Sequence, residues 1–80
     1  MIRISKETVL KPEEIIEKAS RFFGRKGEGM DEKDRTACCV FFEGAGGHVS
    51  LNVVDVQSMR TVEVEAMEWE YQARKFLESL

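Results

Sequence analysis

The chain has 80 residues, of which 42% are hydrophobic and 34% are charged, and it carries a net charge of −3 at pH 7. This length permits one domain around one core, and the composition is that of a globular chain and not of a disordered one. The negative charge gives no general attraction to nucleic acid or to anionic lipid, so neither is an expected partner.

No apolar run approaches the roughly 20 residues that a membrane-spanning helix needs. Residues 1–10 also lack the uninterrupted apolar region of a secretory signal, and we therefore expect a cytoplasmic protein without membrane contact. The two cysteines, Cys38 and Cys39, are adjacent. Neighbours on a strand point to opposite faces, so the sequence predicts two reduced thiols, with Cys38 buried and no disulfide between them.

The first elements in chain order are a short strand and a helix. Residues 1–5 alternate Ile2 and Ile4 with polar side chains, which predicts a strand. A helix is expected from about Pro12, which suits the first helical position, to Phe23, with Gly24 as its stop. Residues 24–35 show no apolar periodicity, so we expect a mobile loop there. The expected helix has one apolar stripe: Ile15, Ile16, Ala19, Phe22 and Phe23.

The strongest local signal is a β-hairpin. Residues 37–43 and 48–54 are rich in β-branched and aromatic side chains, and a glycine-rich link, residues 44–47, joins them. This link pairs Glu43 with His48, and therefore Phe42 with Val49 and Val40 with Leu51.

The last part of the chain permits two interpretations. Residues 60–67 alternate like a strand, yet Val62, Ala66 and Trp69 also begin the spacing of one long amphipathic helix that reaches Leu80. We favour the strand, followed by a helix from about Glu68, because the strand would cover the edge of the hairpin. The spacing alone leaves both possibilities open.

These elements predict an α+β fold over residues 1–80, a single domain with a small antiparallel sheet of three to four strands and two helices packed on one face. The element order is β-α-β-β-β-α. Pairing Val54 with Thr61 makes the helix-covered face entirely apolar, and a slip by one residue would destroy this agreement. The order resembles a reduced helix-grip arrangement, in which a helix lies across a curved antiparallel sheet, and this resemblance of architecture implies no function.

The other sheet face is the candidate site, because two short helices cannot cover both faces. A central aromatic residue within a polar rim is typical of a contact surface. We expect a non-catalytic interaction or small-ligand-binding module that uses this face, with a second copy or another protein as partner and without cofactor or metal. The candidate binding residues are Cys39, Phe41, Glu43, His48, Ser50, Asn52, Glu63, Glu65 and Met67.

Two alternatives belong to other functional classes. Gly24-Arg25-Lys26-Gly27 resembles the GXXG loop with which KH domains clamp a nucleic-acid backbone. The KH pattern continues with an amphipathic helix, however, and residues 30–35 contain one apolar side chain. The second alternative is a small enzyme that uses His48 with Glu43 or Glu65 for acid/base chemistry.

Overall fold

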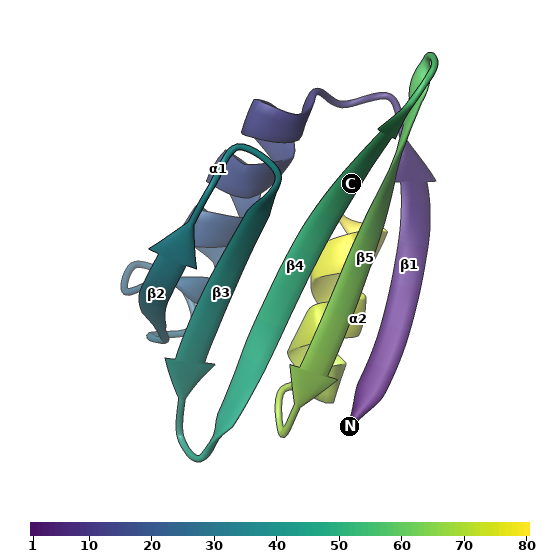
Figure 1. Cartoon of the computed structure of the whole chain (residues 1–80). Helices are drawn as coiled ribbons and strands as arrows, with labels where there is room; N and C mark the ends of the chain where they lie inside the picture. The colour runs from purple at the N-terminus through teal and green to yellow at the C-terminus, as the bar shows by residue number, and fades with distance from the viewer.

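The computed structural model describes all 80 residues and contains a five-stranded antiparallel sheet with both helices on one face (Figure 1). This confirms the α+β class, the antiparallel sheet and the two helices. Residues 60–67 are in a strand, which excludes the long helix. The strand order across the sheet is β1-β5-β4-β3-β2. The elements are β1 (Ile2–Thr8), α1 (Pro12–Phe23), β2 (Asp31–Arg35), β3 (Cys39–Gly44), β4 (Gly47–Val56), β5 (Met59–Met67) and α2 (Glu70–Glu78).

Helix α1 has the predicted limits for local reasons. Pro12 occupies the first turn, and the backbone N–H of Lys11 donates to Oε1 of Glu14 over 3.1 Å. At the other end the N–H of Gly24 donates to the carbonyl of Ser20. A Cβ at Gly24 would clash with that same carbonyl oxygen, so only glycine fits this stop. The segment after β1 leads across one end of the sheet to α1, which lies behind β2 and β3 (Figure 1).

The hairpin of β3 and β4 has the predicted register. Glu43 pairs with His48, Phe42 with Val49 and Val40 with Leu51. Ala45 and Gly46 form the turn with φ values of 48° and 78°, the left-handed backbone of a two-residue hairpin turn.

The pairing of β4 with β5 also agrees with the prediction, including Val54 opposite Thr61. The predicted first strand extends to Thr8 and pairs antiparallel with β5, so it forms one edge of the sheet. The helix-covered face of the sheet packs on a core in which aromatic rings contact one another at centroid distances of 4.9 to 5.5 Å. The aromatic rings are those of Phe22, Phe23, Phe42 and Phe76.

The prediction of a mobile loop over residues 24–35 was wrong. Residues 24–30 form a hydrogen-bonded turn, in which Gly27 N–H donates to Gly24 O and Met30 N–H to Phe23 O. Residues 31–35 then form β2, the fifth strand, which pairs with β3 through a bulge between Glu32 and Asp34. Periodicity could not reveal this strand, because all five of its side chains are exposed.

Polar contacts with α1 hold β2 in place. Oε1 of Glu32 accepts a hydrogen bond of 2.6 Å from the Ser20 hydroxyl, and Nε of Arg35 donates to Oε2 of Glu32 over 3.0 Å. Arg35 also pairs with Glu17 at 3.2 Å and donates to the Ser20 hydroxyl. The Ser20 and Arg35 bonds lower the pKa of Glu32, and Glu32 in turn raises the pKa of Arg35.

The second helix begins slightly later than expected. Helix α2 starts at Glu70, and Trp69 stands at its N-terminal cap position. The indole Nε1 of Trp69 donates to the carbonyl of Gly44 over 2.8 Å. This bond ties the start of α2 to the turn of the β3–β4 hairpin. Neither helix is both long enough and apolar enough to cross a membrane.

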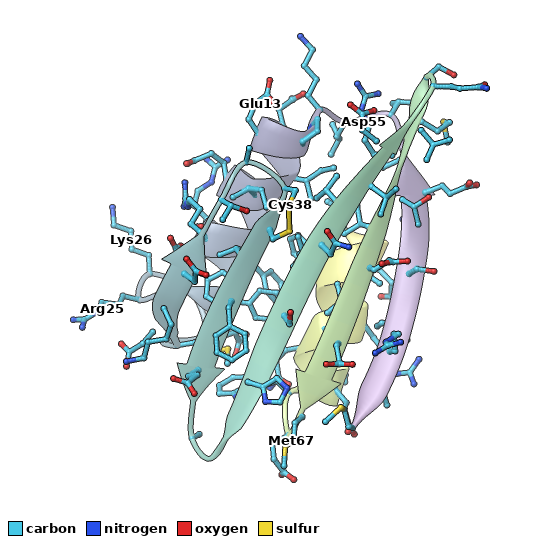
Figure 2. The ribbon with its side chains drawn as sticks, viewed as in Figure 1. Glu13, Arg25, Lys26, Cys38, Asp55 and Met67 are labelled. Atoms are coloured by element: carbon cyan, nitrogen blue, oxygen red, sulfur yellow. A yellow bond between two sulfur atoms is a disulfide. The ribbon has the colours of Figure 1, made fainter.

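The cysteines differ from the prediction. Cys38 and Cys39 form a disulfide at the entry to β3, and Cys38 is exposed and not buried under a helix (Figure 2). The buried position predicted for Cys38 from strand parity was wrong because β3 begins only at Cys39. Because Cys38 lies outside the strand, the alternation of strand side chains between the two sheet faces does not direct its side chain to the core.

Candidate functional site

The sheet face opposite the helices, called the open face below, brings the nine predicted site residues together. Strand pairing arranges them in three rows, and each row crosses β3, β4 and β5. In order, the rows are Cys39–Asn52–Glu63, Phe41–Ser50–Glu65 and Glu43–His48–Met67. The sequence therefore predicted the layout of this central part, because the register followed from the apolar face alone.

The two flanks of the open face were not predicted from the sequence. Arg3 and Ser5 of β1 pair with Glu65 and Glu63, and so extend two of the rows at one edge, and Glu7 pairs with Thr61 beyond the rows. Their alternation with Ile2 and Ile4 was visible in the sequence, but nothing there showed which strand β1 would join. At the other edge, Asp31 lies opposite Glu43 and Asp34 opposite Phe41. No sequence signal indicated this edge.

An aromatic pair lies on this face. The rings of Phe41 and His48 are stacked, with centroids 5.6 Å apart and an interplanar angle of 30°. Both side chains are half-buried although no helix covers them. Glu43 stands opposite His48, but no hydrogen bond joins the imidazole to Glu43 or to Glu65. The stack thus offers a flat, preorganised contact area.

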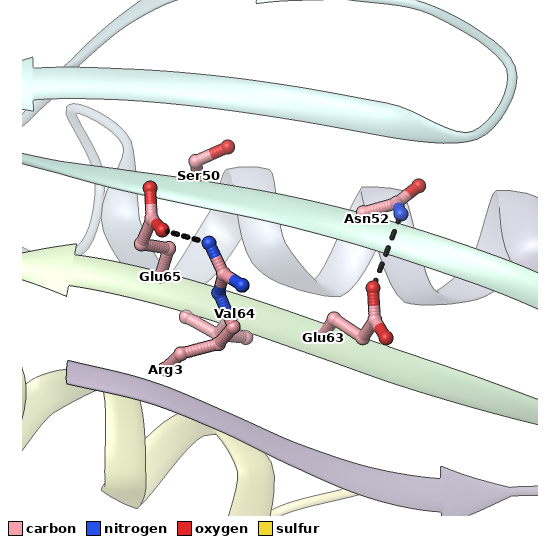
Figure 3. Close-up of a pocket in the computed structure, with 6 residues that line it drawn as sticks. All are labelled: Arg3, Ser50, Asn52, Glu63, Val64 and Glu65. Atoms are coloured by element: carbon pink, nitrogen blue, oxygen red, sulfur yellow. Dashed lines mark hydrogen bonds and ion pairs between the residues drawn. The ribbon is translucent and has the colours of Figure 1, made fainter.

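A shallow depression of about 340 Å³ lies beside the stack, across β4, β5 and β1 (Figure 3). Its only apolar lining residue is Val64. Nη2 of Arg3 pairs with Oε2 of Glu65 at 2.6 Å, and this bond lowers the pKa of Glu65 and raises that of Arg3. The other lining residues are Ser50, Asn52 and Glu63.

Asn52 links Glu63 to the disulfide. Its amide Nδ2 donates to Oε1 of Glu63 over 3.3 Å, and its Oδ1 lies 3.2 Å from Sγ of Cys39. As a disulfide sulfur, Sγ of Cys39 carries no hydrogen, so this second contact is not a donated hydrogen bond. Near Cys38, the Thr36 hydroxyl lies 3.5 Å from the other sulfur.

The open face is acidic. Arg3 is the single guanidinium that strand parity places on it, and Glu65 already neutralises that charge. The carboxylates placed there by pairing are Glu7, Asp31, Asp34, Glu43, Glu63 and Glu65. Of these, Asp31 forms an ion pair with Arg25 at 3.6 Å, at the edge of the face. The electrostatic potential of this surface therefore favours cations, although the whole chain carries only −3.

No group of three or more His, Cys, Asp or Glu side chains is arranged to hold a metal ion. The GXXG segment leads from α1 to strand β2, without the following helix of a KH domain. Its glycines have a structural explanation, because a Cβ at Gly24 or Gly27 would clash with carbonyls of α1. Arg25 and Lys26 project from this turn at the edge of the molecule (Figure 2).

No family model, curated protein or solved structure matches the chain.

Proposed function

We propose that this protein is a non-catalytic binding module whose open face receives a basic, arginine- or lysine-rich segment of a partner protein. The observation that carries this proposal is the half-buried Phe41–His48 stack among carboxylates. Flat aromatic rings next to carboxylates suit guanidinium and ammonium groups, which stack on the rings and pair with the acids.

The charge of the open face favours a basic partner over a second copy of this chain. Two open faces packed against each other would oppose the same carboxylates, for example Glu43 and Glu63, with only Arg3 to compensate. Like charges in an interface cost free energy, and complementary charges speed association and select the partner. Nucleic acid is disfavoured on this face for the same reason.

The test is a calorimetric titration with a short arginine-rich peptide at low and at physiological ionic strength. Binding should weaken as salt is added, because exposed charge pairs are screened. Replacing one carboxylate, Glu63→Gln, should weaken binding about two- to fivefold, the equivalent of a single exposed ion pair. Phe41→Ala should weaken it about tenfold, because it removes the stacking surface.

The matched control is Glu13→Gln on α1, which makes the same charge change away from the open face (Figure 2). It should leave the affinity unchanged within twofold. Equal weakening by Glu13→Gln and Glu63→Gln would mean a non-specific charge effect and would overturn the proposal. Absence of peptide binding together with a concentration-dependent dimer that Phe41→Glu dissociates would assign the face to a second copy.

A further inference from the structure

We infer that the Cys38–Cys39 disulfide is a reversible redox couple that adds or removes a hydrogen-bond donor at Asn52 on the open face. The disulfide, Asn52 and Glu63 form one row across β3, β4 and β5. This inference concerns the row itself and is independent of the partner proposed above.

The number of hydrogen-bond donors in this row depends on whether the two sulfur atoms form a disulfide or two thiols. Nδ2 of Asn52 donates to Glu63, while Oδ1 of Asn52 faces the sulfur of Cys39 at 3.2 Å. In the disulfide that sulfur has no hydrogen to give. A thiol at the same place would donate to Oδ1, because a thiol is a weak donor and an amide oxygen an acceptor. Asn52 is exposed, so in the disulfide state only solvent donates to this oxygen. Reduction therefore adds a donor from the protein without a change of strand register.

Reductants can reach the couple from one side. Cys38 is exposed at the entry to β3, whereas Cys39 is half-buried on the sheet (Figure 2). An attacking thiolate must approach along the S–S axis to a sulfur that it can reach. Sγ of Cys38 is the accessible target, and the sulfur of Cys39 is then the leaving group beside Asn52.

The chemistry requires a dithiol reductant. Its thiolate attacks Sγ of Cys38, the S–S bond breaks, and the electron pair leaves on Sγ of Cys39, which takes a proton from water. The second thiol of the reductant resolves the mixed disulfide, which releases the thiolate of Cys38 for protonation. The protein gains two electrons and two protons, and the reductant becomes a disulfide. An added disulfide oxidant reverses the exchange.

The consequence is local and lies on the binding surface. With a Cys39 thiol, the Asn52 amide is held at both its oxygen and its nitrogen, so its orientation toward Glu63 is stabilised. With the disulfide, only the bond to Glu63 remains. The redox state thus sets how firmly one carboxylate of the open face is engaged by its neighbour.

The test follows the Asn52 side-chain amide by NMR while the intact protein is titrated with dithiothreitol and then with its oxidised form. Thiol counting should rise from none to two per chain, with a mass gain of two hydrogen atoms. The Asn52 amide resonances should shift in parallel and return on reoxidation. A disulfide that resists dithiothreitol under native conditions would overturn the inference, as would free thiols that fail to pair when oxidant is added.

The control variant is Cys38→Ser, which leaves a permanent thiol at Cys39 and changes only an exposed position. Its Asn52 resonances should match those of the reduced wild-type protein and should not respond to dithiothreitol. Asn52 resonances that are identical in oxidised and reduced wild-type protein would show that the sulfur does not act on the amide. Loss of peptide binding in the preceding experiment would leave these readouts unaffected, so the two proposals can fail separately.

Discussion

At the scale of single residues, the β3–β4 turn places opposite demands on two positions that are separated by one residue, Ala45 and Gly47. Ala45 has a φ of 48°, a conformation that costs free energy for most side chains, whereas asparagine adopts it readily. Gly47 has ordinary backbone, but a Cβ there would clash with the carbonyl of Met67. A substitution at Ala45 can therefore stabilise the turn, whereas Gly47 tolerates no side chain.

We expect Ala45→Asn to raise the free energy of unfolding by about 0.5 kcal/mol, because it relieves the strained turn. Gly47→Ala should lower it by several times that amount, since backbone of β4 or β5 must move. Urea denaturation of both variants measures the two effects. A destabilised Ala45→Asn variant would show that the turn does not have this conformation in solution.

Trp69 offers a second prediction at this scale. Trp69→Phe keeps most of the apolar ring but removes the donor to the carbonyl of Gly44. We expect a loss of about 1 kcal/mol of unfolding free energy, the typical value of one such bond. Thermal denaturation of the variant should show one cooperative transition at lower temperature. An unchanged midpoint would indicate that water replaces the indole without cost.

At the scale of elements, β2 depends on α1 more than on its own sequence. Its five residues bury no apolar side chain, so pairing with β3 and the contacts from Ser20 and Glu17 must hold it. Glu32 is central to these contacts, and its pKa is lowered below the ordinary value of 4.5. A lowered pKa means that the folded state favours the ionised carboxylate.

This gives a pH dependence with a defined sign. The contribution of Glu32 is fully present above its ordinary pKa of 4.5 and is lost as the pH falls through its lower folded value. Glu32→Gln should therefore lower the unfolding free energy at pH 7, by up to about 1 kcal/mol for so exposed a pair, and this effect should diminish as the pH falls below 4.5.

Chemical denaturation at several pH values, with Glu13→Gln as control, measures this difference. A constant effect of Glu32→Gln across the whole range would mean that its loss of charge is irrelevant and that another property of the side chain matters. Backbone hydrogen exchange should also be faster in β2 of the variant than in β3, because the strand would open locally.

At the scale of the whole molecule, charge is unevenly divided between the two sides of the sheet. The open face carries carboxylates with one guanidinium, whereas the two helices carry acids and bases in nearly equal numbers: Glu13, Glu14, Glu17, Glu70 and Glu78 against Lys18, Arg21, Arg74 and Lys75. This division, together with the stack of Phe41 and His48, is the basis of the cationic partner proposed above. It also opposes contact between two open faces.

We therefore expect the isolated chain to remain monomeric at low ionic strength, even at high concentration. Sedimentation equilibrium over a range of concentrations and salt measures this. If the open face has a weak tendency to self-associate, dimers should increase as salt screens the carboxylates. A dimer that is strongest at low salt would contradict the charge argument.

The sequence by itself determined the elements whose side chains alternate between core and solvent. Pro12 and Gly24 limited α1, and the apolar alternation on β3, β4 and β5 permitted one register, which placed the nine central site residues in their rows. The reason is that burying one face of a strand makes a shift by one residue very costly.

Only the tertiary structure decided the edges of the sheet and the state of the cysteines. Strand β2 has no apolar side chain to reveal it, and Arg3 joins Glu65 across 62 positions of sequence. Cys38 departs from strand parity because β3 begins at Cys39 and not at Ala37, where the sequence pattern placed its start. In each case the deciding interaction joins backbone, charge or sulfur atoms and not apolar surface, so the hydrophobic pattern contained no information about it.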